Sequence, residues 1–143
     1  MVADFGSRVL VADGDPALRQ RLFSRLLDAD IFSDCVGTGQ EVLAKLGEFV
    51  YTVVIVDLGL PGTDAMQVLA QIGEMPSRPV VLVTAESNAA RALDIEVVQI
   101  VLRKPFDVDQ VAELVRNCVR TVASRGGPVA AEPEPIDPKR VEP

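Results

Sequence analysis

The sequence contains no histidine and no tryptophan, and only two of its 143 residues are cysteines. Without histidine, the chain cannot form a Ser-His or Cys-His nucleophile pair, a His-ligated metal site or a phosphohistidine of its own. Cys35 and Cys118 lie far apart and lack metal-binding spacing, so we expect reduced thiols in an intracellular protein and no disulfide framework. Any histidine chemistry must therefore come from a partner.

Membrane and nucleic-acid signals are also missing. The amino terminus has no basic stretch followed by an apolar segment, and no uninterrupted apolar run is long enough to span a bilayer. The net charge of −7 disfavours electrostatic capture of nucleic acid, which depends on Lys and Arg side chains that neutralise phosphates. We therefore expect a cytoplasmic protein with no membrane partner and no direct nucleic-acid partner.

Apolar runs alternate with segments of helical period over residues 8–122. Strands are predicted over residues 8–12, 31–36, 52–57, 79–84 and 97–102. Helices are predicted to begin near Asp15, Thr38, Asp64 and Val108, and residues 85–96 leave room only for a short helix. Strands that alternate with helices at this spacing favour a parallel sheet with right-handed crossovers.

Two of the predicted helices have clear start signals. Asp15-Pro16 places an N-cap acid before a proline in the first turn, and Thr38-Gly39-Gln40-Glu41 has the form of a capping box. The apolar side chains of the first helix are expected to face the sheet; they are Leu18, Leu22, Phe23, Leu26 and Leu27.

The pattern stops at Ser124. Five of the ten prolines fall in the last sixteen residues, among several acids. Such a segment cannot bury enough apolar surface to fold. We therefore predict one domain over residues 1–123 and a disordered Pro/Glu-rich tail or linker stub over residues 124–143.

Polar residues follow four of the predicted strands: Asp13 and Asp15, then Asp57, Thr84 and Lys104. Because the carboxyl ends of parallel strands meet at one edge of a sheet, we expect these side chains to lie close together. Acids, a hydroxyl and an ammonium group could there bind Mg²⁺ and a phosphoryl group. Each also has a plainer interpretation, since an Asp can start a turn or cap a helix.

With these residues in place, the sequence resembles a response-regulator receiver domain of two-component signalling over residues 8 to about 122. The matching motifs are VLVADGDP at residues 9–16, VDLGLPG at 56–62, VTA at 83–85 and RKPFD at 103–107. The resemblance implies an α/β fold with a doubly wound five-stranded parallel sheet of order 2-1-3-4-5, as in flavodoxin and CheY.

The resemblance further implies a phosphorylation switch. Asp57 would accept a phosphoryl group from a phosphohistidine on a sensor histidine kinase or a histidine phosphotransfer protein. Lys104 and Thr84 would contact the phosphoryl oxygens, and a cis Lys104-Pro105 peptide would aim the ammonium group inward. Such a domain is not an independent enzyme, and it would act on a downstream protein target or output domain, with a homodimer as a further option.

The resemblance also implies a Mg²⁺ site. Asp13, Asp57 and the backbone carbonyl of Gly59 would be its ligands, and Asp15 is a further candidate. In receivers, Gly59 and Glu86 would flank the route of the hydrolytic water and so tune the lifetime of the phosphoryl group.

Three departures from the receiver pattern weaken parts of this interpretation. Gly14 occupies the second position of the family's acidic pair, so Mg²⁺ binding should be weak. Val101 stands where the family usually has an aromatic switch residue, three before Lys104, and the segment from Thr84 to Lys104 is about two residues short. These departures favour an alternative, a degenerate receiver that acts as a phosphorylation-independent protein-protein interaction module.

A third hypothesis is a phosphatase that resembles the haloacid dehalogenase superfamily. Asp13-Gly14-Asp15 has the form of its Asp-x-Asp nucleophile motif, and Thr84 and Lys104 would fill the second and third motifs. Asp107 or Asp109 would then be the late acids. Their spacing fits poorly, and this hypothesis leaves the motif around Asp57 unexplained.

Overall fold

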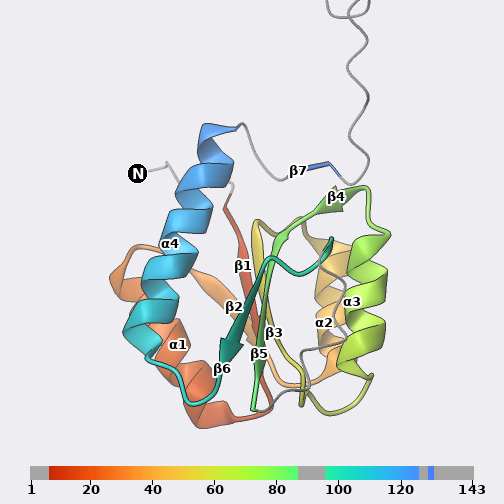
Figure 1. Cartoon of the computed structure of the whole chain (residues 1–143), viewed down its shortest axis with the longest axis horizontal. Coiled ribbons are helices and arrows are strands. Elements are labelled where there is room, and N and C mark those ends of the chain that lie inside the picture. The colour runs from red at the N-terminus through yellow and green to blue at the C-terminus, as the bar shows by residue number, and fades with distance from the viewer. Residues whose placement is uncertain (1–6, 87–95, 126–128, 131–143) are drawn as a thin grey trace, which may run out of the picture.

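The computed structural model describes residues 7–86, 96–125 and 129–130. A five-stranded parallel sheet of order β2-β1-β3-β5-β6 forms its centre (Figure 1). Its strands are β1 (Val9–Ala12), β2 (Ser33–Val36), β3 (Val53–Asp57), β5 (Val80–Ala85) and β6 (Ile100–Arg103). Counted along the chain within this sheet, the order is 2-1-3-4-5, so the predicted doubly wound architecture is confirmed.

Helices cover both faces of the sheet. On one face lie α1 (Pro16–Asp28) and α4 (Val108–Ser124), and on the other lie α2 (Gly39–Glu48) and α3 (Ala65–Gly73) (Figure 1). Alternate side chains of each strand therefore enter two separate cores, as Leu10 and Val54 do on the α2–α3 side and Val9 and Val11 on the α1–α4 side. Burial on both faces explains why the central strands β1, β3 and β5 are continuous apolar runs in the sequence.

The helix start signals are formed as predicted. The Asp15 side chain caps α1 by accepting the N–H of Ala17, and Pro16 is its first residue. At α2, Thr38 and Glu41 form the reciprocal capping box, and each satisfies a backbone N–H group near the helix start.

The prediction for the inner face of α1 is confirmed for three of its five residues; Phe23 is half-buried and packs against Phe32. Leu18, Leu22 and Leu26 are buried, whereas Leu27 is 48% exposed. The buried residues follow one another at intervals of four, and Leu27 lies about 100° further round the helix, beyond the stripe that contacts the sheet.

The fifth strand of the sheet also begins later than predicted. β6 starts at Ile100, whereas Val97 and Val98 precede it as buried residues outside the strand. The side-chain carbonyl of Gln99 accepts the Val81 N–H at 2.6 Å, so a side chain supplies the acceptor that a longer strand would supply from its backbone.

Two predictions fall partly outside the described residues. The short helix expected over residues 85–96 would lie mostly within residues 87–95, and most of the predicted tail lies in residues 126–128 and 131–143. Within that tail, β7 (Val129–Ala130) pairs antiparallel with β4 (Ser77–Arg78), a small second sheet that the sequence argument did not anticipate.

Cys35 and Cys118 are free thiols and half-buried. Within the described ranges, no helix is both long and apolar enough to cross a membrane.

Candidate functional site

Four of the five polar residues predicted to converge meet at the carboxyl edge of the sheet, and the fifth, Asp15, caps α1 instead. Asp13 follows β1, and Asp57 ends β3 directly opposite Thr84 of β5. Lys104 follows β6 and is held there by its backbone N–H, which donates to the Ala85 carbonyl at 2.8 Å. The side chains of Asp13, Asp57 and Thr84 are buried, so the chain gathers two carboxylates and a hydroxyl in a low-dielectric position.

The ammonium group of Lys104 joins the two carboxylates. Its Nζ lies 2.9 Å from Asp13 Oδ2 and 3.3 Å from Asp57 Oδ2, and the side chain is 16% exposed. Burial lowers the pKa of Lys104, but the hydrogen bond and charge of Asp13, followed by those of Asp57, outweigh it and raise the pKa overall. Lys104 is therefore a protonated counter-ion, without which two buried anions would face each other.

Asp13 is held from several directions. Its Oδ1 accepts the Asp15 N–H at 2.9 Å, its Oδ2 accepts from Lys104, and its carbonyl oxygen accepts from Arg19 Nη1 at 2.8 Å. Arg19 is a residue that the sequence argument missed, although its place one turn into α1, behind the β1–α1 loop, could have indicated it. These contacts fix the direction of the Asp13 carboxylate.

Asp15 has a different role in this structure. Its Oδ1 accepts the Ala17 N–H at 3.0 Å as the N-cap of α1, and the residue is exposed. Capping is thus the observed interaction, and metal ligation by Asp15 stays a prediction.

Asp57 is oriented by its own turn and by β5. Thr84 Oγ1 donates to Asp57 Oδ1 at 3.4 Å, and the Leu60 N–H donates to the Asp57 carbonyl at 3.0 Å. A side chain at Gly59 would begin 3.7 Å from Asp57 Oδ2, so the backbone of Gly59 lies beside the carboxylate. With 8% exposure, Asp57 is nearly enclosed but still reachable from the edge of the sheet.

The donor set fits a magnesium ion. Among the described residues, no group of three or more His, Cys, Asp or Glu side chains could hold a metal. However, Mg²⁺ usually needs only one or two carboxylates together with water and phosphate oxygens, and Asp13 and Asp57 supply these next to the Gly59 backbone. Lys104 already contacts both acids and offsets one of their two negative charges. This contact is a second physical reason, besides the missing acid at Gly14, to expect weak Mg²⁺ binding.

Gly14 is packed more closely than the sequence suggested. A Cβ atom at this position would lie 2.9 Å from Cδ of Pro61, in the turn after β3. That separation is too short for an ordinary carbon contact, so an acidic side chain at position 14 requires Pro61 to move. A substitution that restores the acid at position 14 must therefore also accommodate Pro61.

The surroundings of Lys104 confirm one further expectation and add a pocket that was not predicted. The Lys104-Pro105 peptide is cis, as the resemblance implied. An open pocket of about 450 Å³ adjoins the ammonium group and is lined by Asp15, Leu18, Arg21, Glu86, Lys104, Pro105 and Phe106. Val101, in place of the aromatic residue, is 42% exposed on β6.

The acids required by the phosphatase hypothesis point elsewhere. Asp107 accepts the Asp109 N–H at 2.9 Å as the N-cap of α4, and Asp109 pairs with Arg25 of α1 at 2.5 Å. Neither acid is available to the cluster around Lys104, so the geometry gives this hypothesis no support.

This fold and this cluster define a class of signalling domain, and comparison with known proteins identifies it. The family model of the response regulator receiver domain matches residues 9–116, and the chain belongs to this family. The DNA-binding transcriptional regulator NtrC of Salmonella typhimurium is 32% identical over 114 residues, which cover 78% of this chain and 24% of that protein. The transcriptional regulatory protein ResD of Bacillus subtilis is 29% identical over 117 residues, covering 80% of this chain and 48% of ResD. The chain thus spans half or less of the length of these relatives.

Solved structures show the same fold. The signal receiver domain of a LuxO repressor protein from Vibrio parahaemolyticus aligns with a TM-score of 0.74 at 19% identity, covering 83% of this chain and 94% of that chain. The response regulator protein TrrA of Thermotoga maritima, solved in complex with Mg²⁺-BeF, aligns with a TM-score of 0.69 at 25% identity, covering 78% of this chain and 98% of that one.

Proposed function

We propose that this receiver domain is a phosphoacceptor switch in which Asp57 takes a phosphoryl group from a phosphohistidine of a sensor histidine kinase or a histidine phosphotransfer protein. The observation that carries the proposal is the Asp57 carboxylate, enclosed at the sheet edge between the Thr84 hydroxyl and the Lys104 ammonium group. Because residues 1–143 contain no histidine, the donor phosphohistidine must lie outside this sequence.

In the proposed transfer, one carboxylate oxygen of Asp57 attacks phosphorus and forms a P–O bond. The P–N bond to the donor histidine breaks, and the ring nitrogen keeps the electron pair. Lys104, already 3.3 Å from Asp57 Oδ2, would neutralise part of the new charge, and the Thr84 hydroxyl could donate to a phosphoryl oxygen instead of to Asp57.

The product carries about −1.5 to −2 more charges than a neutral side chain, in a site that already holds Asp13. Asp13 and Asp57, with the Gly59 carbonyl, would hold Mg²⁺, which supplies the further positive charge that the acyl phosphate needs. The similar TrrA domain, solved with Mg²⁺-BeF, supports this part of the proposal. Because Gly14 replaces an acid and Lys104 competes for both carboxylates, we propose weak Mg²⁺ affinity.

The proposed output is a change in binding to a downstream protein target or output domain, and the domain turns over no substrate of its own. The greater length of NtrC and ResD is compatible with an output domain elsewhere in a longer chain. A cytoplasmic location and the lack of direct nucleic-acid binding stay predictions from the sequence.

Intact-mass spectrometry after incubation with acetyl phosphate and Mg²⁺ tests the switch. We expect one added phosphoryl group on the wild-type chain and none on Asp57→Asn. Asp64→Asn is a matched control, because Asp64 is exposed and its side chain makes no capping bond at α3. No adduct on the wild-type chain at saturating phosphodonor and Mg²⁺ would refute the proposal.

The alternative of a degenerate, phosphorylation-independent interaction module is favoured by the contact of Gly14 with Pro61, which leaves no room for a second acid without rearrangement. It predicts that partner binding is the same for the wild-type chain and for Asp57→Ala. A change in partner affinity when Asp57 is removed or phosphorylated would reject this alternative.

A further inference from the structure

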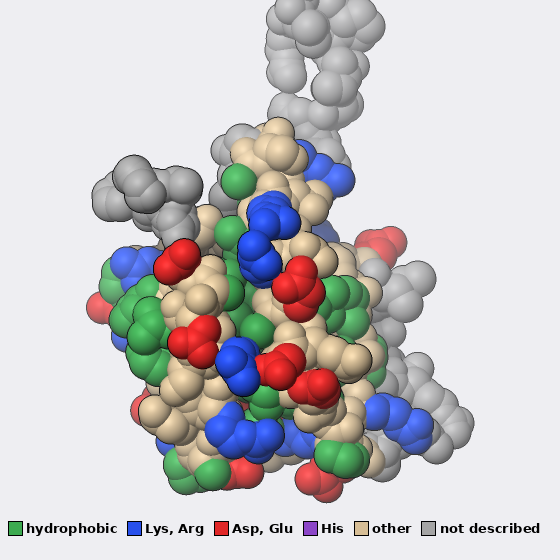
Figure 2. Space-filling view, turned by 90° about the vertical axis from the view of Figure 1, so that its left-hand side faces the viewer, with side chains coloured by type: hydrophobic (Ala, Val, Ile, Leu, Met, Phe, Trp, Pro, Cys, Tyr) green, Lys and Arg blue, Asp and Glu red, His purple; other side chains and the backbone are tan. Residues whose placement is uncertain are grey.

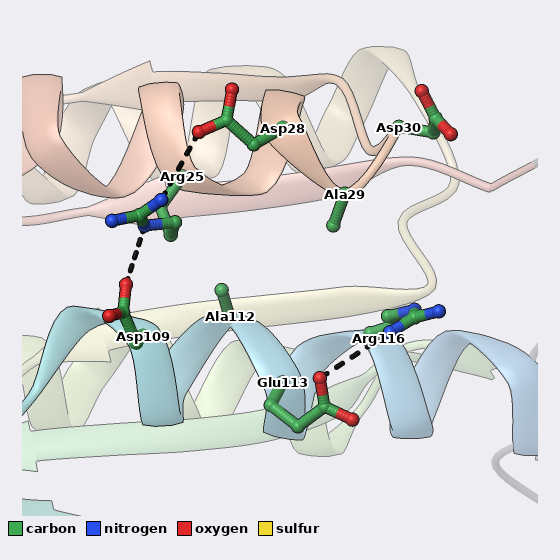
Figure 3. Close-up of a pocket in the computed structure, with 8 residues that line it drawn as sticks. All are labelled: Arg25, Asp28, Ala29, Asp30, Asp109, Ala112, Glu113 and Arg116. Carbon is green, nitrogen blue, oxygen red and sulfur yellow. Dashed lines mark hydrogen bonds and ion pairs between the residues drawn. The ribbon is translucent and has the colours of Figure 1, made fainter.

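The two faces of the sheet differ in what their helices contact at the carboxyl edge. Figure 2 shows the α1–α4 face, on which acidic and basic side chains lie close together. Arg25 contacts Asp28 at 3.2 Å and Asp109 at 2.5 Å, and these side chains line the cleft between the two helices (Figure 3). These contacts include no residue of the loops that follow β1, β2 and β3. On the other face, by contrast, the first turn of α2 contacts one of those loops directly.

The β3–α3 loop, residues 58–64, is hydrogen-bonded to the first turn of α2. The Gly39 N–H donates to the Pro61 carbonyl at 2.9 Å. The Thr63 N–H donates to Gln40 Oε1 at 3.0 Å, across 23 residues of sequence. One backbone bond and one side-chain bond therefore join the same loop to the same helix turn.

The approach of helix and loop is closest at Gly39, the first residue of α2. Gly39 is buried, and a Cβ atom there would overlap the Thr63 carbonyl oxygen and lie 2.8 Å from its carbonyl carbon. Those atoms belong to the backbone, so the loop itself would have to move. The capping box of Thr38 and Glu41 fixes the start of the helix at this point. The loop can lie this close to α2 only because residue 39 has no side chain.

The β3–α3 loop contributes two parts of the phosphorylation site. The Gly59 backbone lies beside the Asp57 carboxylate, and the Pro61 ring lies against Gly14 in the loop after β1. The carbonyl of the same proline accepts the Gly39 N–H. Pro61 is thus held by α2 on one side and packs on the β1–α1 loop on the other, so α2 sets the distance between the two loops.

We propose that Gly39 and Gln40 are positioning residues of the phosphorylation site. They hold the β3–α3 loop where Gly59 lies beside Asp57 and Pro61 covers Gly14. Neither residue contacts a reacting atom, and both act through the loop. The metal part of this proposal rests on the proposed function, in which the Gly59 carbonyl is a Mg²⁺ ligand, whereas the packing of Pro61 on Gly14 does not.

Two glycines of α2 allow a matched pair of substitutions. Alanine normally favours a helix over glycine, and a Cβ atom at Gly47 would meet nothing within 4 Å. We therefore expect Gly47→Ala to raise Tm and leave the Mg²⁺ dissociation constant unchanged. Gly39→Ala should lower Tm and raise that constant about tenfold, the usual effect of disturbing a group that supports metal ligands. Equal constants for the two variants in calorimetric titration would overturn the positioning role.

Gln40 allows a test by rescue. Gln40→Met keeps the length of the side chain but removes the acceptor of the Thr63 N–H, and Gln40→Glu keeps that acceptor. We expect the first variant to raise the Mg²⁺ dissociation constant about threefold, as for the loss of one hydrogen bond, and the second to keep the wild-type value. Titration in about 0.5 M KCl screens the added charge of the glutamate. A wild-type constant for Gln40→Met, or no rescue by Gln40→Glu, would overturn the role of Gln40.

A double-mutant cycle in EDTA tests the packing part without metal. The atoms nearest to a Cβ at Gly14 belong to Pro61 and Gly37, not to Gln40. Gly14→Asp should raise the unfolding equilibrium constant about tenfold in the wild-type chain, because it displaces Pro61. In the Gln40→Met chain the rise should be only about threefold, because the released loop lets Pro61 shift. Additive effects of the two substitutions would show that Gln40 does not hold Pro61.

The two measurements separate this proposal from the proposed function. If the wild-type chain binds no Mg²⁺, the metal part falls with the proposed function, and the cycle in EDTA still decides the packing part. If the wild-type chain binds Mg²⁺ and is phosphorylated but Gly39→Ala behaves as Gly47→Ala does, the proposed function stands and the positioning role is wrong. Circular dichroism melting of each variant sets a titration temperature at which all of them are folded.

Discussion

Replacing Lys104 by methionine tests whether its ammonium group stands in for a divalent cation between Asp13 and Asp57. The substitution keeps most of the side-chain volume and removes the charge together with the hydrogen bond that the ammonium group donates to Asp13. In the absence of metal, the two buried carboxylates would then face each other without a counter-ion. We expect the variant to be less stable than the wild-type chain for this reason alone.

The magnitude follows from the contacts at 2.9 and 3.3 Å. At an effective dielectric constant of about 20, each such contact is worth about 5 kcal/mol before desolvation. Removing one member of a buried ion pair costs about 3–5 kcal/mol in practice, and the 16% exposure of Lys104 lowers this figure. We expect a loss of about 2–3 kcal/mol in unfolding free energy, or about 10 °C in Tm.

Urea unfolding in EDTA and in excess Mg²⁺ is the assay. Mg²⁺ should stabilise Lys104→Met more than the wild-type chain, because the ammonium group no longer competes for the carboxylates. Lys45→Met is the control, since the Lys45 ammonium lies 5.6 Å from the Phe49 ring and has no acidic partner among the described residues. Equal stability of Lys104→Met and the wild-type chain in EDTA, or an equal gain from Mg²⁺, would refute the reasoning.

Three further predictions concern packing, the missing acid and pH. Gly14→Asp alone should lose about 1–2 kcal/mol of unfolding free energy, because its Cβ would lie 2.9 Å from Pro61. Its Mg²⁺ affinity should rise fully only when it is combined with Pro61→Ala. Equal Mg²⁺ dissociation constants for the single and double variants, measured by calorimetric titration, would contradict this coupling. Leu22→Ala should lower the free energy of urea unfolding by about 3 kcal/mol and Leu27→Ala by less than about 0.5 kcal/mol, because only Leu22 is buried against the sheet. Similar losses in the two variants would show that the inner face of α1 is wrongly placed. Since the pKa of Lys104 is raised, its contribution to stability is complete below pH 10.5 and is lost as the pH rises through the higher folded-state pKa. Above pH 10.5, the free energy of unfolding should therefore fall less steeply with pH in Lys104→Met than in the wild-type chain. An identical fall in both chains would count against the ion pair.

The convergence of the site residues could be predicted because it depends on topology. Asp13, Asp57, Thr84 and Lys104 each come at the end of an apolar run, and parallel strands bring such positions to one edge. No knowledge of side-chain contacts was needed for that inference. The contacts themselves were not predictable, since the position of the Lys104 ammonium group between both acids depends on distances set by three strands.

The features that the sequence did not predict correctly also depend on how elements pack against one another. Leu27 has the same chemistry as Leu26 and follows it in the sequence, but only the rotation of α1 on the sheet decides which of the two is covered. The start of β6 depends on the Gln99 side chain accepting the Val81 N–H, a contact between residues far apart in the chain. The contact of Gly14 with Pro61 likewise joins two loops that the sequence shows only separately.

By itself, the sequence determined the alternation of strands and helices, the helix caps and the identity of the residues at the strand ends, because these depend on local periodicity and on side chains close in the chain. Only the tertiary structure decided that Lys104 joins Asp13 to Asp57, that Pro61 closes over Gly14 and that Leu27 and Phe32 remain exposed beside Asp30 and Arg120. Each of these depends on the distance and orientation between elements, which close packing of the whole domain sets and which no local pattern encodes.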